Sequence, residues 1–226
     1  MLLCKDVILQ RESAHFSRRE AWKMNTNLRE DNKIVRIIEY ISELFILNML
    51  TLLCCLPVIT AGSSVTAMHT VLQKMVRHEG GYIVKPFFSA FRENFRQATL
   101  IWLLFLAILL PAGIEILAYM YAPSVLPRAL VIIAASVAIF MLMFLVYVFP
   151  LQARFKNDIS GTLKLAMTLA AARFPRTLLM TLLCAVPAAL AMFGGLMILP
   201  FVFLYGFSLP GFLCAKIYDP VFRELE

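Results

Sequence analysis

Charged residues are scarce in this sequence. Only 15% of its 226 residues are Asp, Glu, Lys or Arg, whereas 61% are hydrophobic, and the mean hydropathy is +0.81. Soluble globular domains contain about 25% charged and about 45–50% apolar residues, so this composition excludes a water-soluble globular protein. The length suits one compact membrane domain of several helices rather than two domains.

Residue patterns that carry catalytic or metal chemistry are also missing. The five cysteines include no Cys-x-x-Cys pair, and the three histidines lack metal-ligand spacing, which argues against a disulfide framework or a zinc site. Neither a phosphate-binding or dinucleotide-binding glycine loop, nor the HExxH or GxSxG motif, occurs in the chain. The acidic residues within the apolar runs are not paired for acid–base catalysis. We therefore predict a non-enzymatic protein without a metal or a cofactor.

Residues 1–36 lack the pattern of a secretory signal. Their first apolar run is short, charges of both signs are scattered through the segment, and no cleavage pattern of small residues precedes the next apolar stretch. We expect a cytoplasmic N-terminal tail here, with Met24 as an alternative start.

Long apolar runs are what the chain has in abundance. A helix needs about 20 apolar residues to cross a hydrocarbon core of about 30 Å. Five runs meet or approach this length: 37–59, 98–121, 125–149, 177–193 and 195–217. The segment 60–77 is only marginally hydropathic, so the distribution of charge has to decide whether it crosses.

Basic residues cluster between the apolar runs. Of 21 Lys and Arg residues, eight precede residue 37, five lie between Lys74 and Arg96, and five lie between Arg154 and Arg176. Cytoplasmic loops are enriched in Lys and Arg, and all three clusters share one side only if residues 37–77 cross twice or re-enter. We predict an all-α polytopic transmembrane bundle with about six crossings and cytoplasmic N- and C-termini. Basic clusters beside spans predict contact with anionic lipid headgroups and no nucleic-acid partner.

Two cytoplasmic loops carry amphipathic patterns that predict interfacial helices. The first would begin at Pro86, since proline suits the first turn of a helix, with an apolar face of Phe87, Phe88, Phe91 and Phe95. The second would be capped by Asp158 or Ser160 and end at Pro175, with Ile159, Leu163, Ala166, Met167, Ala170 and Phe174 on one side.

A loose similarity between residues 94–100 and 173–179 predicts an internal repeat. Each unit would be an interfacial helix followed by a hairpin, over 85–150 and 157–217, and both would begin on the same side of the membrane. With the first hairpin at 37–84, they would form a single membrane domain over 37–226.

Polar residues interrupt the first hairpin at matching levels. If the chain turns near Thr60, Glu43 is level with Arg77 and His78, Asn48 with Gln73, and Thr51 with His69. The polar positions of the second segment share one helical face: Thr66, His69, Gln73 and Arg77. We interpret this stripe as helix packing, with a ligand or proton path as the alternative. Across the next turn, Glu115 and Arg128 are expected to form an ion pair.

Four segments of the first half carry a resemblance to a known family. They are Leu-Asn at 47–48, Cys-Leu-Pro-Val-Ile-Thr-Ala-Gly at 55–62, Val-Arg-x-Glu-x-Gly-Tyr at 76–82 and Phe-x-x-Ala-Phe-x-x-Asn-Phe-x-Gln-Ala-Thr at 87–99. Together they resemble the YesL-like family of bacterial integral membrane proteins, also known as domain of unknown function 624.

The resemblance implies a multi-pass protein of the bacterial plasma membrane whose relatives are often encoded beside carbohydrate transporter components and sensor kinases. We therefore expect a non-enzymatic accessory protein of an oligosaccharide ABC uptake system, with a permease or sensor kinase subunit as partner. Two alternatives stay open: a transporter that uses the polar stripe of the first hairpin, and a purely structural bundle that organises lipid.

Overall fold

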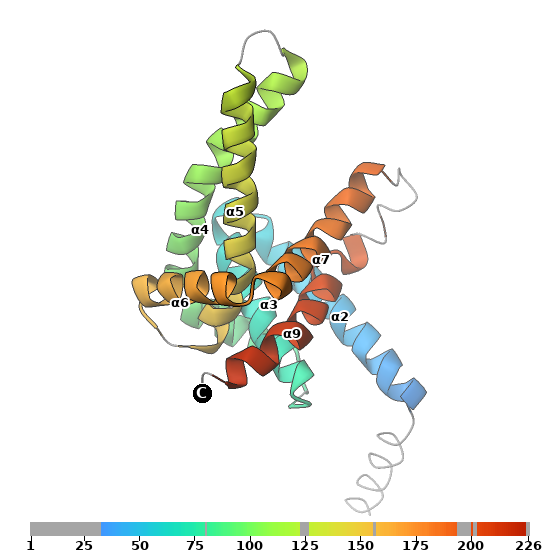
Figure 1. The fold of residues 1–226 in the computed structure, drawn as a ribbon. Coiled ribbons are helices and arrows are strands. Elements are labelled where there is room, and N and C mark those ends of the chain that lie inside the picture. The colour runs from blue at the N-terminus through green and yellow to red at the C-terminus, as the bar shows by residue number, and fades with distance from the viewer. Residues whose placement is uncertain are drawn as a thin grey trace, which may run out of the picture. The chain divides into compact units, whose positions relative to one another are not determined.

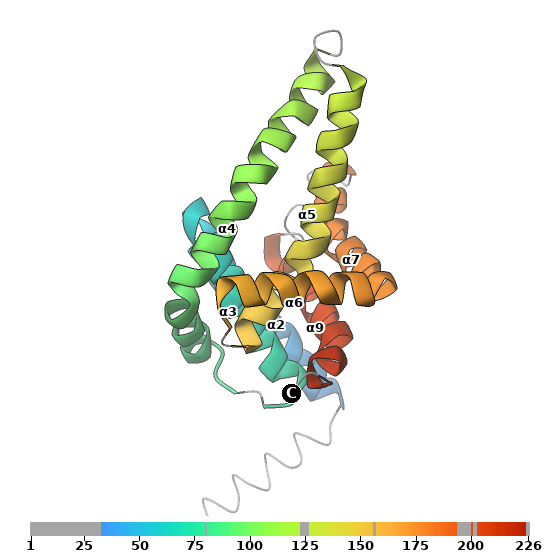
Figure 2. The ribbon, with the colours of Figure 1, turned by 60° about the vertical axis from the view of Figure 1, so that its left-hand side comes forward.

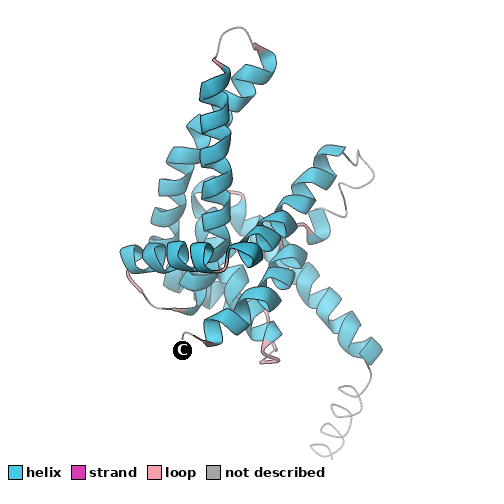
Figure 3. Ribbon diagram, viewed as in Figure 1, coloured by secondary structure: helices cyan, strands magenta, loops and turns pink. Residues whose placement is uncertain are grey.

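The computed structural model describes residues 33–79, 81–122, 127–155, 157–193, 200 and 203–224. Within these residues the protein is helical and contains no strand (Figure 3). The chain divides into two compact units, residues 1–43 and 44–226. Helix α2 (Lys33–Cys55) begins in the first unit and continues into the second. The predicted N-terminal tail lies outside the described residues, apart from the helical residues 33–36.

Among the described residues, four helices are long and apolar enough to cross a membrane. They are α2, α4 (Val84–Tyr121), α5 (Arg128–Arg154) and α7 (Phe174–Phe193), and they coincide with four of the predicted runs. In α5 only 6% of the most apolar stretch is buried inside the protein. An aliphatic surface of this extent is incompatible with water, so these helices make the chain a membrane protein, and the predicted all-α fold class is confirmed.

Helix α3 (Ala61–Val76) forms the centre of the second unit. It follows a short 3-10 helix, η1 (Val58–Thr60), and eleven of its 16 residues are buried. Its neighbours are α4, α5 and the last helix, α9 (Ser208–Arg223). At 1.5 Å per residue α3 is about 24 Å long, which is shorter than the hydrocarbon core. Segment 60–77 is thus a helix as expected, while its full crossing and the six-crossing topology stay predictions.

The approach of α3 to α4 depends on Gly62. A Cβ atom at this position would lie 2.5 Å from the carbonyl oxygen of Ala98 and 2.5 Å from Cβ of Trp102. Small residues let helix backbones approach closely inside membranes, and Gly62 is followed by two buried serines. The Trp102 indole then donates a hydrogen bond of 2.8 Å to the carbonyl of Val58, which fixes η1 against α4.

Helix α4 corrects the prediction of a separate interfacial helix at Pro86. Its 38 residues form one continuous helix from Val84 to Tyr121 (Figure 2), about 57 Å long, because no glycine or proline interrupts it between Pro86 and Pro111. The four phenylalanines predicted to form one apolar face differ in their burial. Phe87 is buried and Phe91 half-buried, whereas Phe88 and Phe95 are exposed.

Helix α6 (Ile159–Ala172) is separate from the span that follows, as predicted for the second interfacial helix. Asp158 occupies its N-cap position, and the helix lies across α5 (Figures 1 and 2). It ends at Ala172, three residues before the predicted end at Pro175, and Pro175 lies in the first turn of α7, which begins at Phe174. Its buried residues are Thr162, Ala166 and Leu169. Of the predicted apolar face, Ala166 is buried, Met167 is exposed, and Phe174 is the first residue of α7.

The two predicted repeat units differ in architecture. The amphipathic segment is fused to the span in α4, whereas α6 and α7 are separate helices. The predicted last span at 195–217 begins among residues outside the described ones. Helix α9 continues beyond that span to Arg223, and it contacts both α3 and α7. The internal repeat itself stays a prediction.

The expected ion pair between Glu115 and Arg128 is not formed in the described part of the hairpin. Glu115 lies six residues before the end of α4, about 9 Å along the helix axis, whereas Arg128 is the first residue of α5. This difference in level separates the two side chains, and Arg128 is exposed.

Candidate functional site

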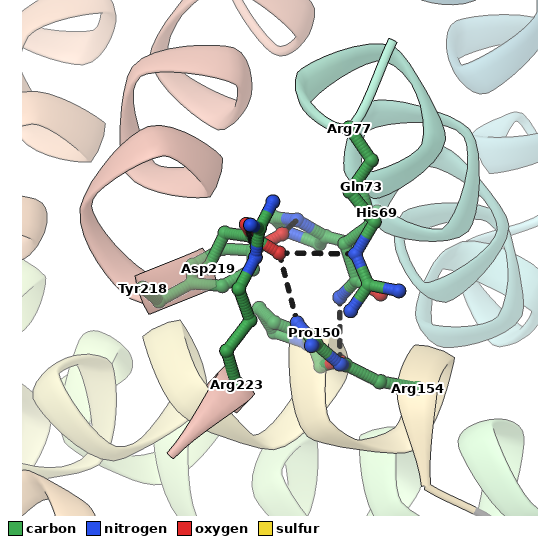
Figure 4. Close-up of polar contacts among 8 residues, drawn as sticks. All are labelled: His69, Gln73, Arg77, Pro150, Arg154, Tyr218, Asp219 and Arg223. Carbon is green, nitrogen blue, oxygen red and sulfur yellow. Dashed lines mark hydrogen bonds and ion pairs between the residues drawn. The ribbon is translucent and has the colours of Figure 1, made fainter. Parts of the chain in front are cut away.

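The polar stripe of α3 faces α5 and α9. His69, Gln73 and Arg77 follow one another at intervals of four residues and therefore lie on one side of the helix. Their side chains meet residues from the last turns of α5 and from α9 (Figure 4). We call this group of eight residues the polar cluster: His69, Gln73, Arg77, Pro150, Arg154, Tyr218, Asp219 and Arg223.

Asp219 is the centre of the polar cluster. Its Oδ1 accepts hydrogen bonds from Nη1 of Arg154 at 2.9 Å and from Nε of Arg77 at 3.3 Å, and its Oδ2 accepts one from Nε of Arg223 at 2.8 Å. Only 4% of the Asp219 side chain is exposed. A buried carboxylate is stable only when opposite charges and hydrogen-bond donors surround it. The carboxylate therefore joins the ends of α3, α5 and α9.

Arg154 is the most deeply buried of the three arginines, with 5% of its side chain exposed. Its guanidinium carbon lies 5.5 Å from the ring centroid of Phe222, an arrangement in which the aromatic face stabilises the cation. The Arg223 side chain, by contrast, is 59% exposed. The cluster thus extends from the protein interior to its surface.

Two neutral contacts continue the cluster along α3. Nε2 of Gln73 donates to the carbonyl oxygen of Pro150 at 2.9 Å. Nδ1 of His69 lies 3.1 Å from the hydroxyl of Tyr218, and the two rings meet edge to face. Each residue of the stripe from His69 to Arg77 therefore has a partner on α5 or α9.

Asn48 has a different role from the one predicted. Its Nδ2 donates to the carbonyl of Phe203 at 2.7 Å, and its Oδ1 accepts from the backbone N–H groups of Phe207 and Ser208, both at 3.0 Å. The first N–H groups of a helix have no partner within that helix. Asn48 of α2 thus caps the N-terminus of α9.

These contacts correct the predicted pairing of the first hairpin. Asn48 bonds to the start of α9 and not to Gln73, and His69 bonds to Tyr218 and not to Thr51. The hydroxyl of Thr51 donates to Leu47, and that of Thr66 donates to Gly62, each one turn back in its own helix. Thr66 is therefore outside the polar cluster. Glu43 belongs to the first unit, and its pairing with Arg77 stays a prediction.

Asp219, Arg154, Tyr218 and Arg223 were not identified from the sequence. One signal was available: Asp219 and Arg223 are four residues apart, the spacing of an ion pair on one helix face. The partners from α3 and α5 had no such signal, because they are 142 and 65 residues away from Asp219.

Replacement of Asn48 by Ala should destabilise the second unit by about 1–3 kcal/mol, because it leaves the buried N–H of Ser208 without its acceptor. The measurement is the thermal unfolding midpoint of the purified protein in detergent, together with amide hydrogen exchange at Phe207 and Ser208. Thr51→Val is the matched control, since the Thr51 hydroxyl serves only its own helix. Equal midpoints for the two variants would contradict the capping role.

Among the residues that the structure describes, no three His, Cys, Asp or Glu side chains come together in a way that suits a metal ion. The three arginines of the polar cluster instead form ion pairs with Asp219. The arrangement of the cluster is suited to holding helix ends together.

Comparison with known proteins gives one match. The family model described as "Protein of unknown function, DUF624" matches residues 44–115. This segment extends from the C-terminal half of α2 through α3 to Glu115 in α4. No curated protein and no solved structure matches the chain. The matched segment contains Gly62 together with its α4 neighbours Ala98 and Trp102. It also contains Asn48 and the polar stripe of α3, but the partners of Asn48, His69, Gln73 and Arg77 lie beyond it. Residues 44–115 are thus similar to the DUF624 family, and the resemblance drawn from the sequence motifs is confirmed there.

Proposed function

We propose that this chain is a non-enzymatic accessory protein that binds another membrane protein. The main observation in support of this proposal is that His69, Gln73 and Arg77 each have a partner on α5 or α9. A transport path needs a continuous row of polar groups that are available to a solute, whereas the side chains of Gln73 and Arg77 bond to α5 and α9. The arrangement therefore supports a scaffold more than a carrier.

The partner that we propose is a permease or sensor kinase subunit of an oligosaccharide ABC uptake system in the bacterial plasma membrane. The family resemblance supports this choice. The exposed rings of Phe88 and Phe95 on α4 offer an apolar contact surface. They lie near basic residues such as Arg92 and Arg96, which suit a position beside anionic lipid headgroups. We place this end of the second unit on the cytoplasmic side.

Cross-linking in native membranes followed by affinity purification tests the proposal. We expect permease or kinase subunits of a carbohydrate uptake system to be recovered with the wild-type chain and to be lost with the double variant F88A/F95A. The control L110A/I114A removes comparable exposed apolar surface farther along α4 and should retain the partner. Recovery of neither kind of subunit, or equal recovery with both variants, would refute the proposal.

Proteoliposomes that contain only this protein test the transporter alternative. We expect no uptake of radiolabelled maltooligosaccharides above that of protein-free liposomes. Uptake that saturates with substrate concentration and is lost in Q73A would instead favour the polar stripe as a path.

A further inference from the structure

A cavity of about 380 Å³ lies between α3, α7 and the start of α9. Its walls are mainly apolar and include Val65 and Met68 of α3 and Pro187 of α7. An apolar pocket of about 110 Å³ shares Pro187, Gly206 and Pro210 with it. Small-molecule sites have typical volumes of about 300–1,000 Å³ and mostly apolar walls with a few polar groups.

The ring of His69 is the polar group that distinguishes this cavity. His69 lines the cavity and is 8% exposed. Its Nδ1 lies 3.1 Å from the Tyr218 hydroxyl. When the Tyr218 hydroxyl donates this hydrogen bond and Nδ1 accepts it, the neutral ring carries its proton on Nε2. None of the described residues accepts a hydrogen bond from Nε2, so this N–H is available to a ligand.

The described wall of the cavity reaches the surface of α7. Cys184 of α7 lines the cavity and is exposed, and α7 is one of the four helices suited to cross the membrane. A molecule dissolved in the bilayer can therefore reach the cavity without passing through water. A single N–H donor within an apolar wall selects a ligand that has an apolar chain and one hydrogen-bond acceptor.

We propose that this cavity binds the acyl chain of a lipid, with the acyl carbonyl oxygen accepting a hydrogen bond from Nε2 of His69. The chain occupies the space beside Val65, Met68 and Pro187. The carbonyl satisfies a donor that otherwise faces an apolar cavity, which is unfavourable. A free fatty acid and an acyl chain of a phospholipid share this chemistry. The site goes beyond the accessory role, and neither proposal depends on the other.

Photolabelling of the purified full-length chain in dodecyl maltoside tests this site. The probes are palmitic acid with a diazirine in its chain and a diazirine-bearing hexadecane without a carbonyl. We expect the acid to label residues 65–69 and 184–191 saturably, and at least tenfold more strongly than the alkane. Unlabelled palmitate and dioleoyl phosphatidylglycerol are competitors in separate arms. Competition by palmitate alone supports a free fatty acid, and competition by the phospholipid supports a membrane lipid.

Three variants separate recognition from folding. His69→Phe keeps an aromatic ring but removes the donor, and it should reduce labelling by the acid at least tenfold without changing labelling by the alkane. Ala191→Phe fills the cavity from α7 and should reduce labelling by both probes. Thr70→Ala lies on α3 outside the cavity wall and should change neither. Equal labelling by acid and alkane in the wild type would overturn the proposal, and so would unchanged labelling by the acid in both H69F and A191F.

Discussion

Replacement of Asp219 by Asn is expected to destabilise the second unit by about 3–5 kcal/mol, the magnitude seen when one partner of a buried ion pair is removed. Asn has almost the same shape as Asp, so the loss would come from charge and not from a cavity. Arg154 would keep its buried guanidinium without the carboxylate that lies 2.9 Å away. The measurement is the yield of monodisperse protein in dodecyl maltoside and its thermal unfolding midpoint.

A second ion pair at the surface supplies the control for Asp219. Arg173 and Glu224 lie 2.5 Å apart, but their side chains are 38% and 59% exposed. Exposed ion pairs contribute about 0–1 kcal/mol, so E224Q should unfold close to the wild-type midpoint. The double variant D219N/R154M should recover part of the stability lost in D219N, because it removes the buried cation that was left without its partner. Similar midpoints for D219N and E224Q would contradict the structural role of the cluster.

Replacement of Gly62 by Ala should destabilise the protein by about 1–3 kcal/mol through overpacking, and Gly62→Val should have a larger effect. The added Cβ atom would lie 2.5 Å from the Ala98 carbonyl oxygen, which is part of the α4 backbone and cannot rotate away. Helices α3 and α4 would have to separate, and the hydrogen bond from Trp102 to Val58 would be strained. The thermal unfolding midpoint and the fluorescence of Trp102 report this change.

Gly113 of α4 is the matched control for Gly62. It lies inside a helix, and a Cβ atom there would have no neighbour within 4 Å. Gly113→Ala should therefore leave the midpoint unchanged or raise it, because alanine favours a helix by about 1 kcal/mol over glycine. If G62A and G113A have equal midpoints, close packing of α3 on α4 does not limit stability.

The sequence predicted the membrane helices well because a span depends on a local property. A run of apolar residues of the right length stays in the bilayer wherever its neighbours are, and α2, α4, α5 and α7 all follow such runs. The same local reasoning located α6, with Asp158 at its N-cap. The same reasoning failed at α4, where the amphipathic helix continues into the membrane span without a break. The amphipathic pattern after Pro86 correctly indicates a helix, but the pattern contains nothing that separates it from the span.

The partners of the polar residues could not be predicted in this way. Counting back and forward from the turn near Thr60 assumes that the two segments of the hairpin face each other at equal levels. The stripe of α3 instead faces α5 and α9. Rotation of a helix about its own axis decides which neighbour its polar face meets, and a hairpin count contains no information about that rotation.

By itself, the sequence determined that this is a helical membrane protein and that a polar stripe within it, including His69 and Gln73, requires partners, because hydropathy and helical spacing belong to the residues themselves. Only the tertiary structure decided that Asn48 caps α9, that Asp219 joins three helix ends and that His69 faces a cavity. Asn48 and Ser208 are 160 residues apart. Contacts of this kind depend on the packing and register of distant helices, which local patterns do not specify.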